Sequence, residues 1–195
     1  MTYQRLLLVS LIQTDLLALA QTVCGKNGNY TSNSVYGANI NTTLSSIYTN
    51  IGINGFYNAS AGQGPDRVNA IALCRGDVQL NVCRQCVQEA GADLVESCPI
   101  QKEAFVWSEF CSLRYSNGTI YGAVATRPAV SVRNTQNVTS PWQFREAQRA
   151  LLHDLRGRAS AGSSTRKVAA GSATGPDSQM IFGLVQLPEF DIGGL

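Results

Sequence analysis

"LCRGDVQLNVCRQCVQEA", residues 73–90, contains Cys74, Cys83 and Cys86 in a C-x8-C-x2-C pattern. Cysteines at such short spacing hold a metal ion, carry out redox chemistry or form structural disulfides. A structural zinc site usually combines two C-x2-C pairs, or one pair with two histidines, but the only histidine, His153, lies outside the cysteine-containing region. A redox C-x2-C bonds its two cysteines to each other, and the other cysteines would then have to pair separately. We therefore favour structural disulfides and expect no metal, no cofactor and no redox site.

The complete set of cysteines fits a disulfide framework. All six lie within the first 111 residues: Cys24, Cys74, Cys83, Cys86, Cys98 and Cys111. An even number of cysteines is typical of disulfide-bonded domains in exported proteins. Spacing alone does not choose among the possible pairings.

The N-terminus predicts export. Arg5 precedes an apolar run over residues 6–12, and Ala-Leu-Ala at residues 18–20 resembles a cleavage site before Gln21. We interpret residues 1–20 as a secretory signal peptide, although Asp15 favours the alternative of a short amphipathic helix. No later stretch approaches the apolar length of a transmembrane span.

Five N-x-S/T sequons also support export: Asn29, Asn41, Asn58, Asn117 and Asn137. Glycosylation requires an exposed asparagine, so the sequons predict five surface positions. Charged residues make up 14% of the chain and the net charge is +2, which gives no electrostatic footprint for nucleic acid or a membrane surface. We expect no nucleic-acid partner.

Apolar spacing predicts two helices. The first covers residues 33–51, where apolar residues recur at helical spacing: Tyr36, Ile40, Leu44, Ile47 and Ile51. The second carries an apolar residue every fourth position: Val82, Cys86, Ala90, Leu94 and Cys98. This row places two thiols on the inner face, while Cys83 lies to one side and can reach back to Cys74.

Four segments read as strands. "GFYNASAGQGPDR" holds a turn between two short strands, and "RVNAIALC" is the second of them. "EAFVWSEFCSLRYS" and "TIYGAVAT" are rich in aromatic and β-branched residues, and residues 116–118 between them predict an Asn-Gly hairpin turn. We expect an α+β fold with two helices on one face of a roughly five-stranded antiparallel sheet.

An incomplete internal repeat follows this domain. Tyr36, Leu44 and Ile47 recur 108 positions later as Phe144, Leu152 and Leu155. Gly-Pro-Asp at residues 64–66 recurs at 175–177, and Leu187 stands where the first copy has Cys74. The second copy therefore has its first helix and two strands, without a cysteine. We expect residues from about 140 onward to be poorly ordered alone or to pack on the first domain, with the Gly- and Ser-rich residues 156–175 as a linker.

The C-x8-C-x2-C run, "GFYNASAGQGPD", "LRYSNGTIYG" and "NTQNVTSPWQF" resemble the ectodomains of plant cysteine-rich receptor-like kinases. These ectodomains, like the cysteine-rich repeat secretory proteins, are built from the salt-stress/antifungal domain, also called the ginkbilobin-homologous domain. The resemblance covers essentially the whole chain and implies two helices on a five-stranded sheet. It assigns residues 21–135 to one such domain and residues 136–195 to a truncated second copy.

The resemblance also implies the disulfide pairing Cys24–Cys98, Cys74–Cys83 and Cys86–Cys111. Relatives that bind mannose use an asparagine after the first cysteine, an arginine before the last one and a glutamate after it. The matching positions here are Gly25, Phe105 and Ser116, so none of the three polar groups is present. Unpaired hydroxyls at a buried sugar site cost about 1–3 kcal/mol each, and we expect no mannose binding of the family type.

Three functional interpretations are set aside. The chain has no Gly-rich nucleotide loop, catalytic loop or DFG motif, so nothing in it predicts a kinase. Arg-Gly-Asp at residues 75–77 spells an adhesive tripeptide, but we expect Asp77 to cap the following helix. Glu103 and Glu109 could form a hydrolase dyad; their even spacing in a predicted strand indicates a shared solvated face instead.

We therefore expect a non-enzymatic, secreted recognition module for stress or defence signalling in the plant apoplast, without kinase or transmembrane parts. Its partner would be an extracellular protein or a cell-wall carbohydrate. The alternative is a secreted antifungal lectin of the same fold with mannose-type specificity. A thiol oxidoreductase is a third possibility only if Cys83 and Cys86 are free or bonded to each other.

Overall fold

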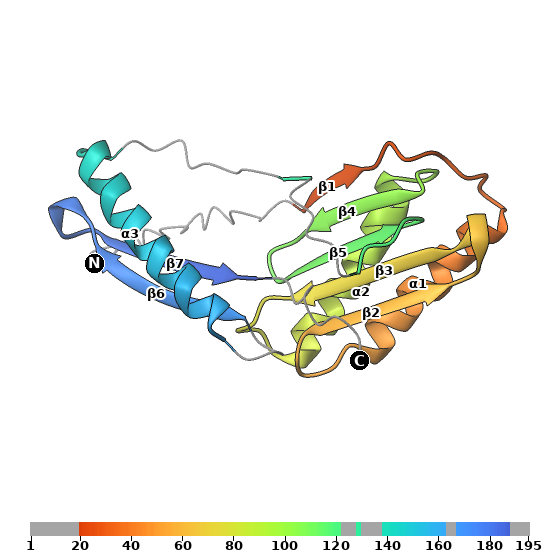
Figure 1. The fold of residues 1–195 in the computed structure, drawn as a ribbon, viewed down its shortest axis with the longest axis horizontal. Coiled ribbons are helices and arrows are strands. Elements are labelled where there is room, and N and C mark those ends of the chain that lie inside the picture. The colour runs from red at the N-terminus through yellow and green to blue at the C-terminus, as the bar shows by residue number, and fades with distance from the viewer. Residues whose placement is uncertain (1–19, 122–127, 130–137, 163–166, 188–195) are drawn as a thin grey trace, which may run out of the picture.

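The computed structural model describes residues 20–121, 128–129, 138–162 and 167–187. These residues form two units, the first with two α-helices and the second with one α-helix on one face of an antiparallel sheet (Figure 1). Apart from Ala20, the expected signal peptide lies outside the described residues.

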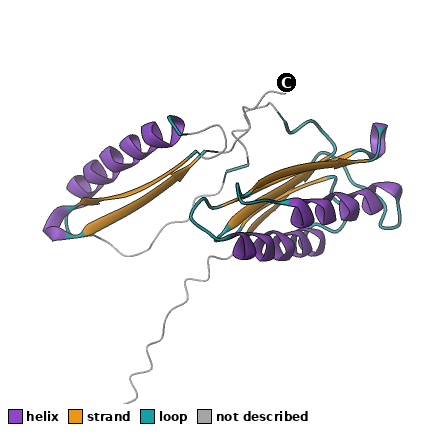
Figure 2. Cartoon of the chain, turned by 90° about the horizontal axis from the view of Figure 1, so that it is seen from below, coloured by secondary structure: helices purple, strands orange, loops and turns teal. Residues whose placement is uncertain are grey.

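The first unit has the predicted α+β fold. Its five strands are β1 (Gln21–Cys24), β2 (Phe56–Ala61), β3 (Val68–Cys74), β4 (Glu103–Trp107) and β5 (Cys111–Ser116). They are antiparallel and lie in the order β1-β4-β5-β3-β2. The helices α1 (Val35–Asn50) and α2 (Leu80–Ser97) both cover one face of this sheet (Figure 2). The other face, called the outer face below, carries no helix of this unit.

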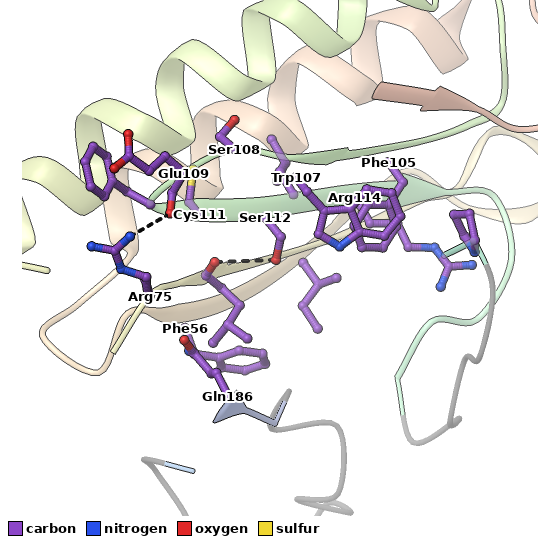
Figure 3. Close-up of a pocket in the computed structure, with 15 residues that line it drawn as sticks. Phe56, Arg75, Phe105, Trp107, Ser108, Glu109, Cys111, Ser112, Arg114 and Gln186 are labelled. Atoms are coloured by element: carbon purple, nitrogen blue, oxygen red, sulfur yellow. Dashed lines mark hydrogen bonds between the residues drawn. The ribbon is translucent and has the colours of Figure 1, made fainter. Parts of the chain in front are cut away.

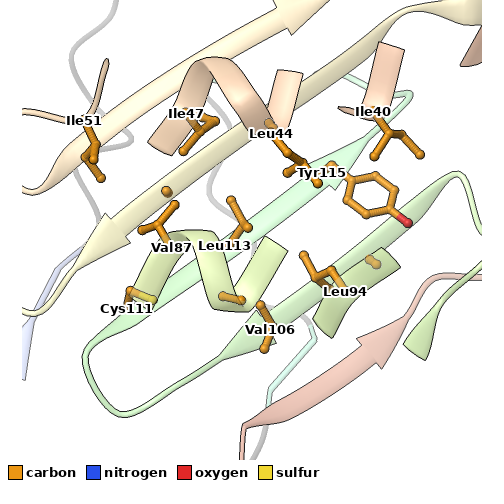
Figure 4. Packing of buried hydrophobic residues seen from close by; sticks show 14 of the residues in the cluster. Ile40, Leu44, Ile47, Ile51, Val87, Leu94, Val106, Cys111, Leu113 and Tyr115 are labelled. Carbon is orange, nitrogen blue, oxygen red and sulfur yellow. The ribbon is translucent and has the colours of Figure 1, made fainter. Parts of the chain in front are cut away.

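The apolar residues that recur along α1 form the centre of the core. Ser34 begins the helix, and its hydroxyl accepts a hydrogen bond from the Gly37 amide at 3.3 Å. All five periodic residues are buried and meet α2 and the sheet in one cluster (Figure 4): Tyr36, Ile40, Leu44, Ile47 and Ile51. Burying one such aliphatic side chain stabilises the fold by about 1.5–3 kcal/mol.

The second helix begins later than its expected cap. Gln79 is the N-cap residue of α2 and makes no side-chain cap hydrogen bond. Asp77 lies two residues further back and pairs with Arg75 at 2.6 Å, so the expectation that Asp77 caps the helix is wrong. The carboxylate is held by the nearer guanidinium instead.

The predicted hairpin at residues 116–118 is also wrong. The chain turns between β4 and β5, where the Ser108 amide donates to the Cys111 carbonyl at 2.8 Å, so "EAFVWSEFCSLRYS" forms both strands. After β5, Gly118 donates to the Ser116 hydroxyl at 3.1 Å in a turn. A strand has only two edges, and those of β5 are taken by β4 and β3. The last residues of "TIYGAVAT" lie outside the described part of the chain.

The fifth strand is β1, which the sequence did not reveal. Its four residues are all half-buried and show no alternation, so no strand pattern is visible in them. Pairing with β4 alone makes these residues a strand.

The second unit repeats the beginning of the first. Helix α3 (Pro141–Ser160) packs on the hairpin of β6 (Val168–Thr174) and β7 (Met180–Gln186), with a 3-10 turn at Pro176–Ser178. The first unit has the same order of helix, strand, 3-10 turn at Gly64–Asp66 and strand. The second unit therefore repeats this part of the first.

Two details of the predicted repeat need correction. Most of the expected linker is regular structure, because residues 156–160 complete α3 and residues 168–174 form β6. Leu152, aligned with buried Leu44, is 40% exposed. At the same offset of 108, the buried residues Thr43, Ile47 and Ile51 correspond to the buried residues of α3: Leu151, Leu155 and Ala159. These residues and the inner side of the hairpin give the second unit a small core of its own.

Candidate binding surface

Three disulfides hold the sheet that carries the candidate site. Cys24 bonds to Cys98, Cys74 to Cys83 and Cys86 to Cys111. This is the pairing that the family resemblance implied. Cys83 and Cys86 therefore bond to two different strands, which leaves neither thiol of the C-x2-C available for redox chemistry.

The register explains why both bonds form from one helix. Cys74 and Cys111 are direct cross-strand partners, and their side chains point toward α2. Cys83 and Cys86, three residues apart on the same side of that helix, each reach one of them. The result is a central pair of strands, β3 and β5, tied to one helix, which gives the outer face a rigid support.

The outer face carries a groove of about 380 Å³ (Figure 3). Cross-strand pairing places its residues in two rows. One row runs Phe56, Leu73, Ser112, Trp107, and the other runs Asn58, Ile71, Arg114, Phe105. The first row and three members of the second line the groove, together with Arg75 and Phe110 at one end. Asn58 is the exposed end of the second row, on the edge strand β2.

Aromatic rings dominate this groove. Phe105 stacks on Trp107 with a centroid distance of 4.0 Å and an angle of 27°. At one end the Arg75 guanidinium lies 5.0 Å from the Phe110 ring centroid. Such pairs add about 0.5–1.5 kcal/mol beyond the area they bury. A partly open, aromatic surface on a rigid sheet has the chemistry of a binding site for apolar anchors.

A polar cluster borders the groove at Arg114. Its guanidinium donates to the Glu103 carboxylate at 2.6 Å, and the Asn27 amide donates to the other oxygen of the same carboxylate. The Glu103 and Arg114 side chains are only 16% and 17% exposed. The Arg114 Nε atom is buried without a protein partner. Both oxygens of the Glu103 carboxylate therefore accept a hydrogen bond, whereas the buried Nε of Arg114 makes none.

The three family mannose positions surround this cluster without supplying sugar ligands. Gly25 donates its amide to the Glu103 carbonyl at 2.7 Å, and a Cβ at Gly25 would lie 2.7 Å from the Glu103 Cβ. An asparagine at position 25 would therefore clash unless β4 shifted. Phe105 points into the groove and Ser116 is 2% exposed. The structure thus gives a steric reason for glycine where the mannose-binding relatives have a polar side chain.

The other candidate residues do not form a common site in the structure. Glu103 begins β4 and Glu109 lies in the turn after it, roughly 20 Å away along an extended chain. The expectation that both carboxylates share one solvated strand face is wrong, because Glu103 is paired with Arg114 and mostly buried. In the Arg-Gly-Asp segment, Arg75 and Asp77 pair with each other. Among the described residues no His, Cys, Asp and Glu side chains gather as a metal site would require.

Sequon asparagines lie at the surface where they are described. Asn29, Asn41, Asn58 and Asn117 are exposed. Asn137 lies outside the described residues. Exposure meets the steric requirement for glycosylation at these four positions.

The second unit touches the first at the end of β7. Gln186 donates to the Cys74 carbonyl at 2.7 Å and accepts from the Gly76 amide at 3.1 Å. The same residue lines one end of the groove. Val168 lies close to Gly76, where an added Cβ would come within 2.7 Å of it.

Sequence reasoning missed the residues that build the groove, above all Phe56, Trp107 and Arg114. A signal for Trp107 exists in "EAFVW", where Ala104 and Val106 are buried and alternate with Phe105 and Trp107, which face outward. Alternation identifies two faces; it does not show which neighbouring strands extend the aromatic face.

Comparisons with known proteins agree with this geometry. The family described as salt stress response/antifungal matches residues 23–118. An antimicrobial ginkbilobin-2-like protein of Castanea crenata is 36% identical over 172 residues, covering 88% of this chain and 70% of that protein. The chain belongs to the salt stress response/antifungal family.

Other relatives are larger. Cysteine-rich receptor-like protein kinase 26 of Arabidopsis thaliana is 39% identical over 90% of this chain, but the chain spans only 27% of that kinase. Cysteine-rich repeat secretory protein 38 of the same plant is 32% identical, and the match covers 82% of this chain and 63% of that protein. The crystal structure of the tandem DUF26 ectodomain of the Arabidopsis thaliana cysteine-rich receptor-like protein PDLP8 matches with a TM-score of 0.63 at 24% identity. The match covers 70% of this chain and 66% of that chain. This likeness shows the shared fold.

The family membership supports an extracellular module that is not a kinase. Within the described part of the chain, no helix combines the length and apolar character that crossing a membrane requires.

Proposed function

We propose that this chain is a non-enzymatic recognition module of the plant apoplast that binds an extracellular protein through the outer-face groove. The carrying observation is the Phe105–Trp107 stack in a groove whose floor is tied to α2 by two disulfides. Aromatic and Arg side chains in a partly desolvated surface are the usual anchors of protein interfaces. A rigid support lowers the entropy that binding costs.

The proposal includes secretion after cleavage of residues 1–20 and a role in stress or defence signalling. Both rest on the family and on the N-terminal pattern. The relatives named as receptor-like kinases suggest that the partner belongs to a signalling system at the cell surface.

Site-specific photo-cross-linking tests the groove. A photoreactive phenylalanine analogue replaces Phe56 in the secreted chain, and a matched variant carries it at Trp142, which is 72% exposed on α3. We expect a discrete extracellular plant protein to cross-link from position 56 and not from position 142. Trp107→Ala in the first variant should abolish the product. Identical products from both positions, or none from position 56, would contradict the proposal.

The alternative is the mannose-type antifungal lectin. One observation favours a polar ligand near the family site: Asn27, Glu103 and Arg114 gather beside Gly25, Phe105 and Ser116, which lack the family's three polar side chains. Their mutual pairing opposes it, because a sugar would have to displace hydrogen bonds already made. Calorimetric titration with mannose and mannan oligosaccharides decides between the two. We expect no saturable heat; saturable binding that Arg114→Met removes would establish the lectin.

A further inference from the structure

One sequon differs from the others in where its asparagine lies. Asn41 is on α1, which covers the inner face of the sheet, whereas Asn58 is in the middle of β2. Phe56, two residues earlier on the same strand, lines the outer-face groove. Because side chains two residues apart on a strand point to the same face, Asn58 also points outward.

The pairing register places Asn58 beside the groove. Its direct partner on β3 is Ile71, which lines the groove, and the same row continues to Arg114 and Phe105. Directly opposite residues have Cβ atoms about 4.5–5.5 Å apart. With strands about 4.8 Å apart, the whole row spans roughly 15 Å, which is within reach of the first few sugars of an N-linked glycan.

The strand position leaves room for such a glycan. β2 is the edge of the five-stranded sheet, so no strand of the described residues lies beyond it. Asn58 is exposed. Phe56 is half-buried and offers an aromatic face on which the C–H face of a sugar ring can pack.

We propose that Asn58 carries an N-linked glycan whose first sugars pack on Phe56 and cover the β2 side of the outer-face groove. The glycan limits which partners enter the groove and from which side. The inference concerns the groove of the proposed function, but it needs no partner. It can therefore be tested separately.

A thermodynamic cycle tests contact between the glycan and Phe56. The secreted chain is produced in eukaryotic cells, and mass spectrometry measures the occupancy of Asn58. Melting temperatures are then compared for the parent, Asn58→Gln, Phe56→Leu and the double variant. We expect removal of the glycan to lower the melting temperature in the parent and to have a smaller effect in Phe56→Leu, since packed groups give non-additive effects.

The matched control is Asn41→Gln. Asn41 is on α1, which covers the inner face of the sheet, so this substitution should be additive with Phe56→Leu. Enzymatic removal of glycans from the folded protein repeats the comparison without the Asn58 substitution. Quenching of Trp107 fluorescence by acrylamide, in a Trp142→Phe background, reports the covering of the groove and should increase when the Asn58 glycan is lost.

An unoccupied Asn58, or an additive cycle with unchanged quenching, would overturn the inference. A non-additive cycle without any cross-linked partner would support the glycan contact and contradict the proposed function. A cross-linked partner together with an additive cycle would support the proposed function and contradict the glycan contact.

Discussion

Two tyrosines show how single residues connect the core to the loop before β4. Tyr36 and Tyr115 are the largest fully buried side chains of the described chain. The Tyr36 hydroxyl donates to the Lys102 carbonyl at 2.7 Å, and the Tyr115 hydroxyl donates to the Gln101 carbonyl at 3.0 Å. Burial, as the largest cause, raises the pKa of both phenols above the ordinary value of 10.0. The folded protein therefore keeps both protons at a pH where the unfolded chain loses them.

This difference predicts alkaline destabilisation. Below pH 10 both states hold the protons and the stability is complete; above it the unfolded state ionises first, so stability falls toward the higher folded pKa. Tyr36→Phe should cost about 1 kcal/mol at neutral pH, from the lost hydrogen bond, and should make the decline above pH 10 shallower. Denaturant unfolding between pH 7 and pH 11 measures both effects. An unchanged alkaline slope would show that Tyr36 does not contribute.

The Glu103–Arg114 pair predicts a second residue-scale effect. Glu103→Gln removes one charge and leaves a mostly buried guanidinium, whereas Glu146→Gln breaks the exposed pair with Arg149. We expect a loss of about 1–3 kcal/mol at position 103, between the exposed and fully buried cases. The control should change stability by less than about 0.5 kcal/mol. Equal effects in urea unfolding would mean that the inner pair is solvated.

At the scale of elements, α2 and α3 differ in what holds them. α2 forms disulfides with β3 and β5, and its C-cap residue Cys98 bonds to β1. α3 packs on β6 and β7 through a core of few residues and through one hydrogen bond from Arg158 to the Ala170 carbonyl at 3.2 Å. The glycines of the hairpin matter here, because a Cβ at Gly183 would lie 2.8 Å from the Leu155 Cδ1. Close packing of α3 on the β6–β7 hairpin therefore takes the place that the disulfides have for α2.

Leu155→Ala should therefore unfold the second unit selectively. Leu155 is 0% exposed, and truncating a buried leucine costs about 2–5 kcal/mol, which is a large share of what so small a core supplies. Hydrogen exchange should show lost protection in α3 and β7 while α2 stays protected. Loss of protection throughout the chain would contradict two separately stabilised units. Leu152→Ala, at a 40% exposed position of the same helix, is the control.

For the whole molecule, the decisive question is how firmly the two units are joined. Gln186 bridges them through the Cys74 carbonyl and the Gly76 amide, at the end of the groove. Along β7 the opposite side from α3 remains open, with Phe182 79% exposed and Met180 52% exposed. Few polar contacts and a small joint surface favour independent motion of domains.

Gln186→Ala removes both hydrogen bonds and should loosen this joint without unfolding either unit. We expect faster amide exchange at Gly76 and a broader distribution of dimensions in small-angle scattering, while the melting temperature of the first unit stays the same. Gln179→Ala, in the turn before β7, serves as the control. A fall in the melting temperature of the first unit would instead show that it relies on the second.

The sequence by itself determined the cysteine-rich α+β domain, the two helices on one face and the repeat of the first helix and two strands in the second unit. These follow from local periodicity and from motif spacing, which act over a few residues and survive in any arrangement of the elements. The tertiary structure alone decided the strand β1, the turn at residues 108–110 and the order of α3, β6 and β7. It also decided the groove, because rows such as Asn58, Ile71, Arg114 and Phe105 exist only once two strand pairs that are far apart in sequence, β2 with β3 and β4 with β5, adopt one register.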